Sequence, residues 1–373
     1  MAESSACKDV PPQTSKLQAT KNLLSVKQHS LKEALSIVRP YAKSNNLKGI
    51  YQAVTSFLVF AALLATMMYL GTEHMWINAL LSIPTGLMLV RLFTLQHDCG
   101  HGSLFKSRKA NDIVGAFFAF LTVTPYQYWR ASHAIHHATT GNLDKRGTGD
   151  IETKTIEEYN ALSRGDKIFY RLIRNPFFLF GIGGFLHFVF KQRLPILHAN
   201  LNKVYLRSVH KTNAMIVLTF IGLHFTYGLV DFLIIYALPV WVASAIGFWL
   251  FYVQHSYHDA YWERQENWDY MKAALEGSTV VNLPPVLRWV SADIGIHHIH
   301  HLLPSIPNYN LRACFKENPH LCVPRQMGWI EALTCTKLAI WDEINEQLIP
   351  FSEMKKRIAA IKSADIGMRQ AAE

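Results

Sequence analysis

The sequence predicts an all-α integral membrane protein with four transmembrane helices in two hairpins, interfacial helices and a cytoplasmic helical cap. Half of its 373 residues are apolar and only 17% are charged. The apolar residues gather in two blocks, about 50–96 and 213–254, while the remainder has the composition of water-exposed protein. This pattern excludes a disordered chain, a collagen, a coiled coil and a disulfide mini-protein.

The N-terminal region, 1–48, is polar and lacks the apolar core of a cleavable signal peptide. Residues 1–28 are rich in Ser, Lys, Gln and Thr, and we expect a flexible tail there. Leu31, Leu35 and Val38 recur at helical spacing, which predicts a short interfacial helix over 31–38. A soluble helix packed on the protein surface is the alternative.

The first transmembrane hairpin is expected within 49–96. Ile50–Leu70 is uncharged and long enough to cross a hydrocarbon core of roughly 30 Å. A polar turn at residues 71–74 precedes a second span, Trp76–Leu95, in which Trp76 suits the headgroup level. Both ends of this hairpin therefore lie on one side of the membrane.

The region 97–212 follows on that side. Ile113–Trp129 contains Pro125, and Phe177–Phe190 is shorter still. Apolar stretches of this length more often lie in an interface or a core than across a bilayer. We expect both to be interfacial or re-entrant segments.

The second hairpin is expected within 213–254, as two spans from Met215 to about Tyr252 with the turn near Val230–Leu233 or at Pro239. The remaining region, 255–373, is polar and contains loops marked by prolines. It is predicted to form a water-exposed cap made of helices.

The net charge of +10 follows this topology. Arg91 is the only Lys or Arg between Gly49 and Phe105, and there is none between Asn213 and Glu263. Basic residues that flank apolar blocks are typical of cytoplasmic loops and of contact with anionic lipids. We therefore predict no nucleic-acid partner. Lys and Arg around 191–211 are expected to contact headgroups, with docking of an acidic electron carrier as the alternative.

The five cysteines form no C-x-x-C pair, and their number is odd. This usage indicates a reducing compartment without a disulfide framework.

Eight of the 18 histidines are grouped in three boxes, and they carry most of the functional information. The boxes contain His97 and His101, then His133, His136 and His137, then His297, His300 and His301. On a helix, residues at i, i+3 and i+4 share one face. Because each hairpin returns the chain to its starting side, all three boxes are expected at the same membrane face.

Neutral imidazole is the commonest protein metal ligand. Eight imidazoles exceed what one tetrahedral or octahedral ion binds, which implies two ions. A dinuclear centre made of nitrogen ligands beside a bilayer favours iron and O2 chemistry over zinc hydrolysis, although composition leaves iron and zinc both open.

Three motifs carry a family resemblance. They are His97-Asp-Cys-Gly-His-Gly-Ser-Leu-Phe105, Trp129-Arg-Ala-Ser-His-Ala-Ile-His-His137, and Gly295-Ile-His-His-Ile-His-His-Leu302 with Pro307-Asn-Tyr309 after it. Over roughly 45–330 the chain resembles the membrane fatty acid desaturases, most closely the acyl-lipid Δ12 (omega-6) branch of bacteria and plastids. The resemblance implies four transmembrane helices, a cytoplasmic cap and a di-iron centre. It also implies O2-dependent formation of a cis double bond, here on oleoyl groups.

The resemblance also implies a set of site residues. The eight box histidines would bind two Fe ions, joined by His255 as a ninth ligand, with His258 as a weaker rival. Further candidates contact the ligands or line the substrate tunnel. The expected hydrogen-bond partners of the ligands are Asp98, Asp150, Asn282, Asp293 and His298, each with a solvated or capping role as the alternative. The tunnel candidates are Trp129 and Trp262, with membrane anchoring as the alternative.

The expected partners follow from this assignment. The substrate is an acyl group carried on membrane lipid, or on CoA or acyl carrier protein. Because the chain contains no H-P-G-G haem motif, electrons would come from a separate ferredoxin or a protein of the cytochrome b5 type. The expected location is a bacterial cytoplasmic membrane with the boxes facing the cytoplasm, and the endoplasmic reticulum or a plastid membrane is the alternative.

Two rival functions remain open from sequence. A fatty acyl hydroxylase or acetylenase would share the boxes and change only the product. A transition-metal transporter would place histidines deep in the spans, where only His224 lies.

Overall fold

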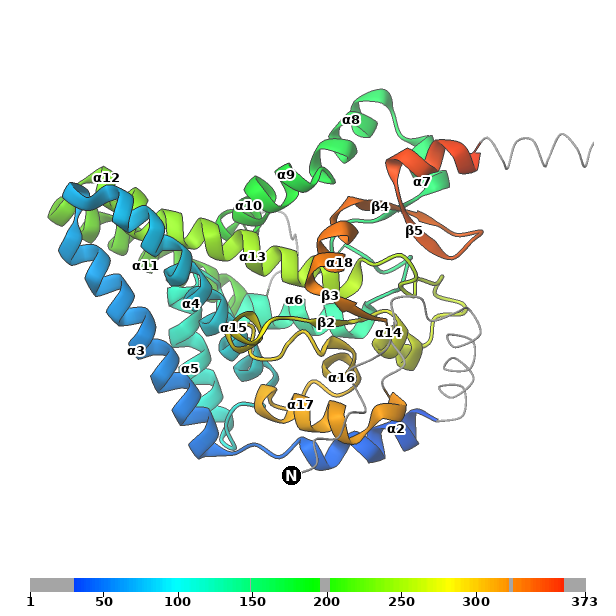
Figure 1. Ribbon diagram of the computed structural model, residues 1–373, viewed down its shortest axis with the longest axis horizontal. Coiled ribbons are helices and arrows are strands. Elements are labelled where there is room, and N and C mark those ends of the chain that lie inside the picture. Colours follow the sequence, from blue (N-terminus) through cyan, green and yellow to red (C-terminus); the bar gives the residue numbers. More distant parts are fainter. Residues whose placement is uncertain (1–29, 148, 195–201, 322–324, 359–373) are drawn as a thin grey trace, which may run out of the picture.

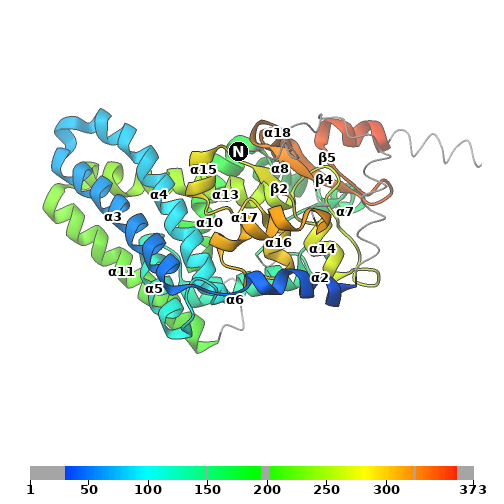
Figure 2. The same ribbon diagram turned by 60° about the horizontal axis from the view of Figure 1, so that its bottom comes forward.

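The computed structural model describes residues 30–147, 149–194, 202–321 and 325–358. Long helices form one side of the molecule. Short helices and two small sheets form a cap on the other side (Figure 1). Figure 2 shows the same division from a second direction, with α3, α4, α5 and α11 on one side and α2, α14, α16 and α17 on the other. The predicted tail at 1–28 lies outside the described residues.

Two long helices cover the region of the predicted first hairpin. Helix α3 spans Asn46–Leu70 and α4 spans Met75–His101, with a short 3-10 turn at Thr72–His74 between them. The side chain of Asn45 caps α3 by accepting a hydrogen bond from the backbone N–H of Lys48. Helix α4 continues past the predicted end at Leu95, so the first histidine box lies on its last turns.

Three described helices are long and apolar enough to cross a membrane: Asn46–Leu70, Thr72–His101 and Leu229–His255. The span predicted from Met215 onward is not among them. It belongs to α11 (Lys203–Tyr227), whose first turns contain Lys203, Arg207 and Lys211 and leave too short an apolar stretch. By length and composition, a bent pair, Arg164–Ile173 and Pro176–Arg193, could supply one further span or a re-entrant loop.

The chain turns at Gly228, two residues before the turn predicted near Val230–Leu233 and well before the alternative at Pro239. Gly228 has a φ of 97°, a conformation that glycine adopts without strain. After it, one continuous helix spans Leu229–His255. It consists of α12 (Leu229–Phe232), a π-helical turn (Leu233–Ala237) and α13 (Leu238–His255). Pro239 lies near the start of α13, directly after the π-helical turn, where its missing N–H is tolerated.

The expectation of an all-α protein is wrong in the cap, which contains two small sheets. Strands β1 (Lys154–Thr155), β4 (Leu338–Asp342) and β5 (Gln347–Pro350) form one sheet in the order β1-β4-β5. Strands β2 (Val280–Asn282) and β3 (Gln326–Gly328) pair in parallel. Segments of two to five residues are too short to show a strand periodicity in the sequence.

The short helix predicted over 31–38 is present as α2 (Leu31–Val38). The expected interfacial segment 113–129 covers parts of two helices, and the segment 177–190 covers two short helices and a π-helical turn. The remaining described helices are α5 (Arg108–Leu121), α6 (Tyr126–Thr139), α7 (Ile156–Ala161), α8 (Arg164–Ile173), α9 (Pro176–Phe178), α10 (Gly184–Val189), α14 (Tyr270–Glu276), α15 (Pro285–Val290), α16 (His297–Leu302), α17 (Asn308–Glu317) and α18 (Trp329–Thr334), and residues 351–358 are also helical.

Helix α4 is the central element of the fold, and it packs against α3, α5 and α13. Its approach to α6 depends on Gly100, because a Cβ at that position would lie 2.8 Å from the ring of Trp129. Helix α13 packs against α4 and ends at His255, and α16 is wholly buried. The last turns of α4 and α13 therefore meet α6 and α16 at the junction of the long helices and the cap.

Candidate metal centre

Nine histidines meet at this junction, in two groups. The first contains His97, His101, His133, His137 and His300, and the second contains His136, His255, His297 and His301. Within each group, one ring nitrogen from every histidine lies within 4.8 Å of the others. All three boxes and the last residue of α13 contribute, so segments far apart in sequence form one site.

The ring nitrogens converge on two points. Nε2 of His137 lies 3.0 Å from Nε2 of His133 and 3.1 Å from Nε2 of His300. In the other group, Nε2 of His297 lies 3.0 Å from Nε2 of His255 and 3.1 Å from Nε2 of His301. A neutral imidazole has a single N–H, so hydrogen bonds among these rings satisfy only part of each group.

In each group, a buried Nε2 also lacks a partner among the described residues. Nε2 of His101 and Nε2 of His136 are buried and make no hydrogen bond there. A buried polar atom without a partner calls for an explanation such as an ion. Two cations, one in each group, would satisfy both nitrogens and the crowded rings, so the residues present fit a dinuclear metal centre.

Burial keeps these histidines in the ligand form. It lowers the pKa of His133, His137, His297, His300 and His301 well below the ordinary value, because the charged imidazolium loses its hydration, and neighbouring histidines lower it further. The rings are therefore neutral at physiological pH. Neutral imidazole is the form that binds Fe, Zn, Cu or Ni.

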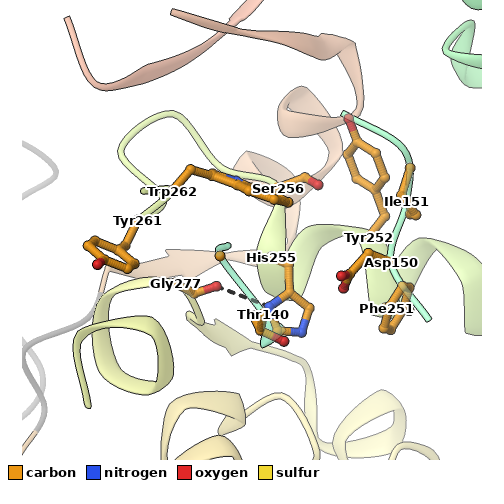
Figure 3. Close-up of a pocket in the computed structure, with 11 residues that line it drawn as sticks. Thr140, Asp150, Ile151, Phe251, Tyr252, His255, Ser256, Tyr261, Trp262 and Gly277 are labelled. Carbon is orange, nitrogen blue, oxygen red and sulfur yellow. Dashed lines mark hydrogen bonds between the residues drawn. The ribbon is translucent and has the colours of Figure 1, made fainter. Parts of the chain in front are cut away.

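Hydrogen bonds outside the two groups orient individual ligands. Nδ1 of His136 donates to Asp150 at 2.5 Å. Nδ1 of His255 donates to the backbone carbonyl of Gly277 at 3.0 Å, the dashed contact in Figure 3. Each contact places the proton on Nδ1 and leaves the lone pair of Nε2 directed to the centre of the group.

Asp98, which was predicted to hydrogen-bond a ligand, lies close to His97 but accepts its hydrogen bonds from Asn308. Its Oδ1 lies 3.5 Å from Nδ1 of His97, and its Oδ2 accepts hydrogen bonds from the backbone N–H and the side-chain amide of Asn308 at 2.7 and 2.8 Å. Asp98 is 2% exposed. It therefore ties the first box to the start of α17, two segments that adjoin the site.

The structure does not bring the other predicted partners to the histidines. Asn282 is exposed on β2. The carboxylate of Asp293 forms ion pairs with Arg312 and Arg288, which occupy the oxygens that a ligand N–H would need. His298 is buried in the cap edge-on to Phe315, with ring centres 5.9 Å apart, and within the described residues neither of its nitrogens has a hydrogen-bond partner. The rival ligand His258 lies outside both histidine groups, whereas His255 belongs to one.

A cavity of about 600 Å³ adjoins the site, a volume typical of ligand pockets. Its walls come from α4, α6, α8–α10 and α13, and His97, His133 and His297 line it. Most of the other lining side chains are apolar, among them Phe93, Phe188 and Phe248. An apolar ligand in this cavity would lie against residues of both histidine groups.

The two tryptophans expected at the substrate tunnel differ in position. Trp129 lines the large cavity and stacks on His133, with ring centres 4.8 Å apart and planes at 13°. Trp262 lies outside that lining. It borders a separate void of about 10 Å³ beside His255 and Asp150 (Figure 3), which is just large enough for one water molecule. Trp262 is therefore beside the metal centre but not in the lining of the large cavity.

Sequence reasoning missed three contributors to the site. Asn308 belongs to the Pro-Asn-Tyr motif that carried the resemblance, and this motif was the available signal for its role. The carbonyl of Gly277 gives no signal in sequence, because any residue offers a carbonyl. Gly149 has a φ of 76°, and a Cβ there would lie 2.9 Å from Cβ of His136, so this glycine lets the chain bring Asp150 against the second box.

Comparison with known proteins agrees with this geometry. The family described as "Fatty acid desaturase" matches residues 74–332. A "Fatty acid desaturase" of Bacillus subtilis is 37% identical over 328 residues, which cover 88% of this chain and 92% of that protein.

Two further relatives are more distant. The "sn-1 oleoyl-lipid 12-desaturase" of Synechocystis sp. is 30% identical over 252 residues, covering 63% of this chain and 67% of that protein. The "sn-2 acyl-lipid omega-3 desaturase (ferredoxin), chloroplastic" of Arabidopsis thaliana is 30% identical over 287 residues, covering 72% and 60% respectively. The match to more than half of the chain, and to nearly all of the Bacillus protein, shows that this chain belongs to the fatty acid desaturase family of oxidoreductases.

Proposed function

We propose that this protein is an O2-dependent acyl-lipid desaturase that introduces a cis double bond at the Δ12 position of oleoyl groups. The observation that carries the proposal is the placement of two adjoining histidine groups beside an apolar cavity of about 600 Å³. Family membership supports the reaction class. The Synechocystis relative, named as an oleoyl-lipid 12-desaturase, supports the position of the double bond.

Two iron ions are the proposed occupants of the groups. The first ion would be held by His97, His101, His133, His137 and His300, and the second by His136, His255, His297 and His301. Iron with O2 supplies the oxidising power to break unactivated C–H bonds, which no side chain provides. In the overall balance, two hydrogens leave adjacent methylenes, and two electrons and two protons enter, so that one O2 becomes two waters.

The protein's own residues bind and orient the acyl chain. The cavity walls contributed by α4, α6 and α13 would hold the chain by apolar contact and exclude water. Trp129 would fix one side of the chain next to His133, on which its ring stacks. The depth to which the acyl chain enters this cavity would set which of its carbons lie against the histidines.

We propose that the protein is a multi-pass membrane protein with four spans in two hairpins, with the cap facing the cytoplasm of a bacterium. The three apolar helices support this placement, and the bent pair Arg164–Ile173 and Pro176–Arg193 or the apolar half of α11 would provide the fourth crossing. The basic residues that flank the apolar blocks support the cytoplasmic side.

The proposed electron donor is a ferredoxin or a protein of the cytochrome b5 type. The name of the Arabidopsis relative includes ferredoxin, and steering between opposite charges would help an acidic carrier to reach a chain of net charge +10. Asp98 and Asp150 are proposed to position His97 and His136 for their ions.

The test is expression in a host whose lipids contain saturated and monounsaturated acyl chains, followed by mass spectrometry that locates each new double bond. We expect a diene formed from oleoyl groups, and about two iron atoms per chain in the purified protein. A product heavier by one oxygen would show a hydroxylase. A double bond at another position would overturn the Δ12 assignment while leaving the reaction class intact.

A further inference from the structure

Arg91 is a charged residue inside a candidate span, and the histidine centre leaves it unexplained. It lies in α4 and is 3% exposed. Its Nε donates to Oγ of Ser56 at 2.8 Å, and Nη1 donates to the backbone carbonyl of Trp289. The guanidinium also lies over the ring of Trp289, 4.1 Å from its centre. Arg91 therefore attaches the short helix α15 to the side of α4.

This attachment fixes the depth of α15. Arg91 precedes His97 by six residues, and a helix rises 1.5 Å per residue, so Arg91 lies about 9 Å from His97 along α4, toward the opposite face of the membrane. The histidine centre lies at the end of that span. A helix held beside Arg91 therefore lies at the level of the span itself, below the water-exposed part of the cap.

Helix α18 begins beside α15. Strands β2 and β3 are parallel, with Asn282 opposite Gly328 in the ladder. Helix α15 follows β2 after two residues, and α18 follows β3 directly. Because the carboxyl ends of parallel strands meet at one edge, both helices leave the cap at the same place. Helix α18 continues into Cys335, which packs in one core with Phe248 of α13.

The two helices expose large apolar side chains at this place. The exposed residues, with their relative accessibility, are Val286 (68%), Trp289 (46%), Trp329 (41%), Ile330 (64%) and Leu333 (48%). Large apolar side chains exposed together on two helices that leave the cap at one edge mark an interaction site. Arg288, which pairs with Asp293 and whose side chain is 40% exposed, precedes Trp289 in the chain. Tryptophan with neighbouring arginine is the composition of the membrane interface.

We propose that α15 and α18 form a lipid-docking surface, which inserts into the same leaflet that the histidine-bearing ends of α4 and α13 enter. This inference rests on the membrane placement given under Proposed function. The occupant is the lipid leaflet because the surface is attached to α4 and α13, two helices that cross it. The surface would hold the cap against the leaflet from which the acyl substrate comes.

The test is fluorescence of a cysteine-linked NBD label on the full-length protein in phospholipid vesicles. Cys7 and Cys322 are replaced by serine, and the buried Cys99, Cys314 and Cys335 are retained. The label is placed by Val286→Cys or Ile330→Cys. Ile344→Cys, in the turn between β4 and β5 and 72% exposed, serves as the matched control in the cap.

We expect phospholipids brominated on their acyl chains to quench the labels at 286 and 330 and to leave the label at 344 unchanged, while aqueous iodide quenches only the label at 344. Quenching of 286 and 330 by iodide, without quenching by brominated lipid, would overturn the docking surface. Shielding from both quenchers would show a protein partner or a second copy in place of lipid, and would also overturn it.

A fourth label separates this inference from the membrane placement. Val54→Cys places the label on α3, where Val54 is 49% exposed. Its quenching by brominated lipid is required by the proposed spans. If the label at 54 is quenched and those at 286 and 330 are not, the docking surface alone fails. If the label at 54 is not quenched either, the membrane placement fails with it.

Discussion

The carboxylate of Asp150 accepts a hydrogen bond from Nδ1 of His136 at 2.5 Å, although the two residues come from different segments of the chain. Both side chains are buried. The contact is possible because Gly149, with its positive φ, brings the loop close to the helix of the second box. A carboxylate at this distance fixes the orientation of the ring and raises its basicity as a ligand.

Loss of this carboxylate is expected to weaken metal binding in the four-histidine group. Asp150→Ala should lower metal affinity there by about 10–100-fold, because His136 loses the group that orients its ring. The measurement is iron per chain after dialysis against a graded chelator series. Glu152→Ala is the matched control, since the side chain of Glu152 is about half exposed and pairs with Lys154. Equal iron retention in both variants would refute the orienting role.

Neighbouring histidines of the third box are expected to behave differently. His300→Ala should abolish desaturation and reduce the iron content, while the protein remains in the membrane, because His300 belongs to the five-histidine group. His298→Ala should retain both iron ions, because its ring lies against Phe315. Fatty acid profiles and iron analysis of membranes from both variants provide the test. Undiminished double-bond formation by His300→Ala would exclude it as a ligand.

The contrast between His298 and His300 shows how far sequence reasoning reached. The i, i+3, i+4 spacing indicated which box histidines share a face, and the structure brings those eight together with His255. The contact with Phe315 depends on how α16 packs in the cap, which the spacing does not contain. Asp293 was a plausible partner by position, but Arg312, 19 residues later in the chain, pairs with it.

The fold was predictable where the sequence contains long apolar runs. Two runs of about twenty apolar residues predicted α3 and α4, because only helices satisfy their own backbone groups in a membrane. The two small sheets of the cap gave no such signal, because their strands are short and pair across large sequence separations. Strand β2 meets β3 46 residues later, and β1 meets β4 after 186. Such pairings depend on tertiary contacts.

The stability of the metal-free protein is expected to fall in mild acid. Burial lowers the pKa of His133, His137 and His300 below the ordinary value of 6.5. Below about pH 6.5 the unfolded chain therefore takes up protons that the folded protein does not. The free energy of unfolding is at its full value above that pH, and it decreases as the pH falls toward the lowered values.

Thermal unfolding of chelator-treated protein in detergent measures this dependence. The midpoint should be constant between about pH 8 and 7 and should decrease steadily from about pH 6.5 to 5. Bound metal should raise the midpoint at neutral pH, because the ion binds only the folded site. A midpoint that stays constant through mild acid would mean that these rings are protonated in the folded state, which contradicts a buried ligand set.

The size of the cavity is expected to control which acyl chains react. Gly247 lies on α13 and lines the cavity, and a Cβ added there would meet no atom within 4 Å. Gly247→Leu should therefore find room for its Cβ and add four carbons to the wall of the cavity. Because one methylene changes discrimination in an apolar pocket by roughly 10-fold or more, products from longer acyl chains should decrease at least that much relative to those from shorter chains.

Gly222→Leu is the matched control, since Gly222 is also helical with open space around its Cβ and lies outside the cavity lining. The ratio of long-chain to short-chain products in host lipids is the measurement. An equal ratio in both variants would mean that the acyl chain lies elsewhere, because no chain could occupy this cavity unaffected by a leucine in its wall.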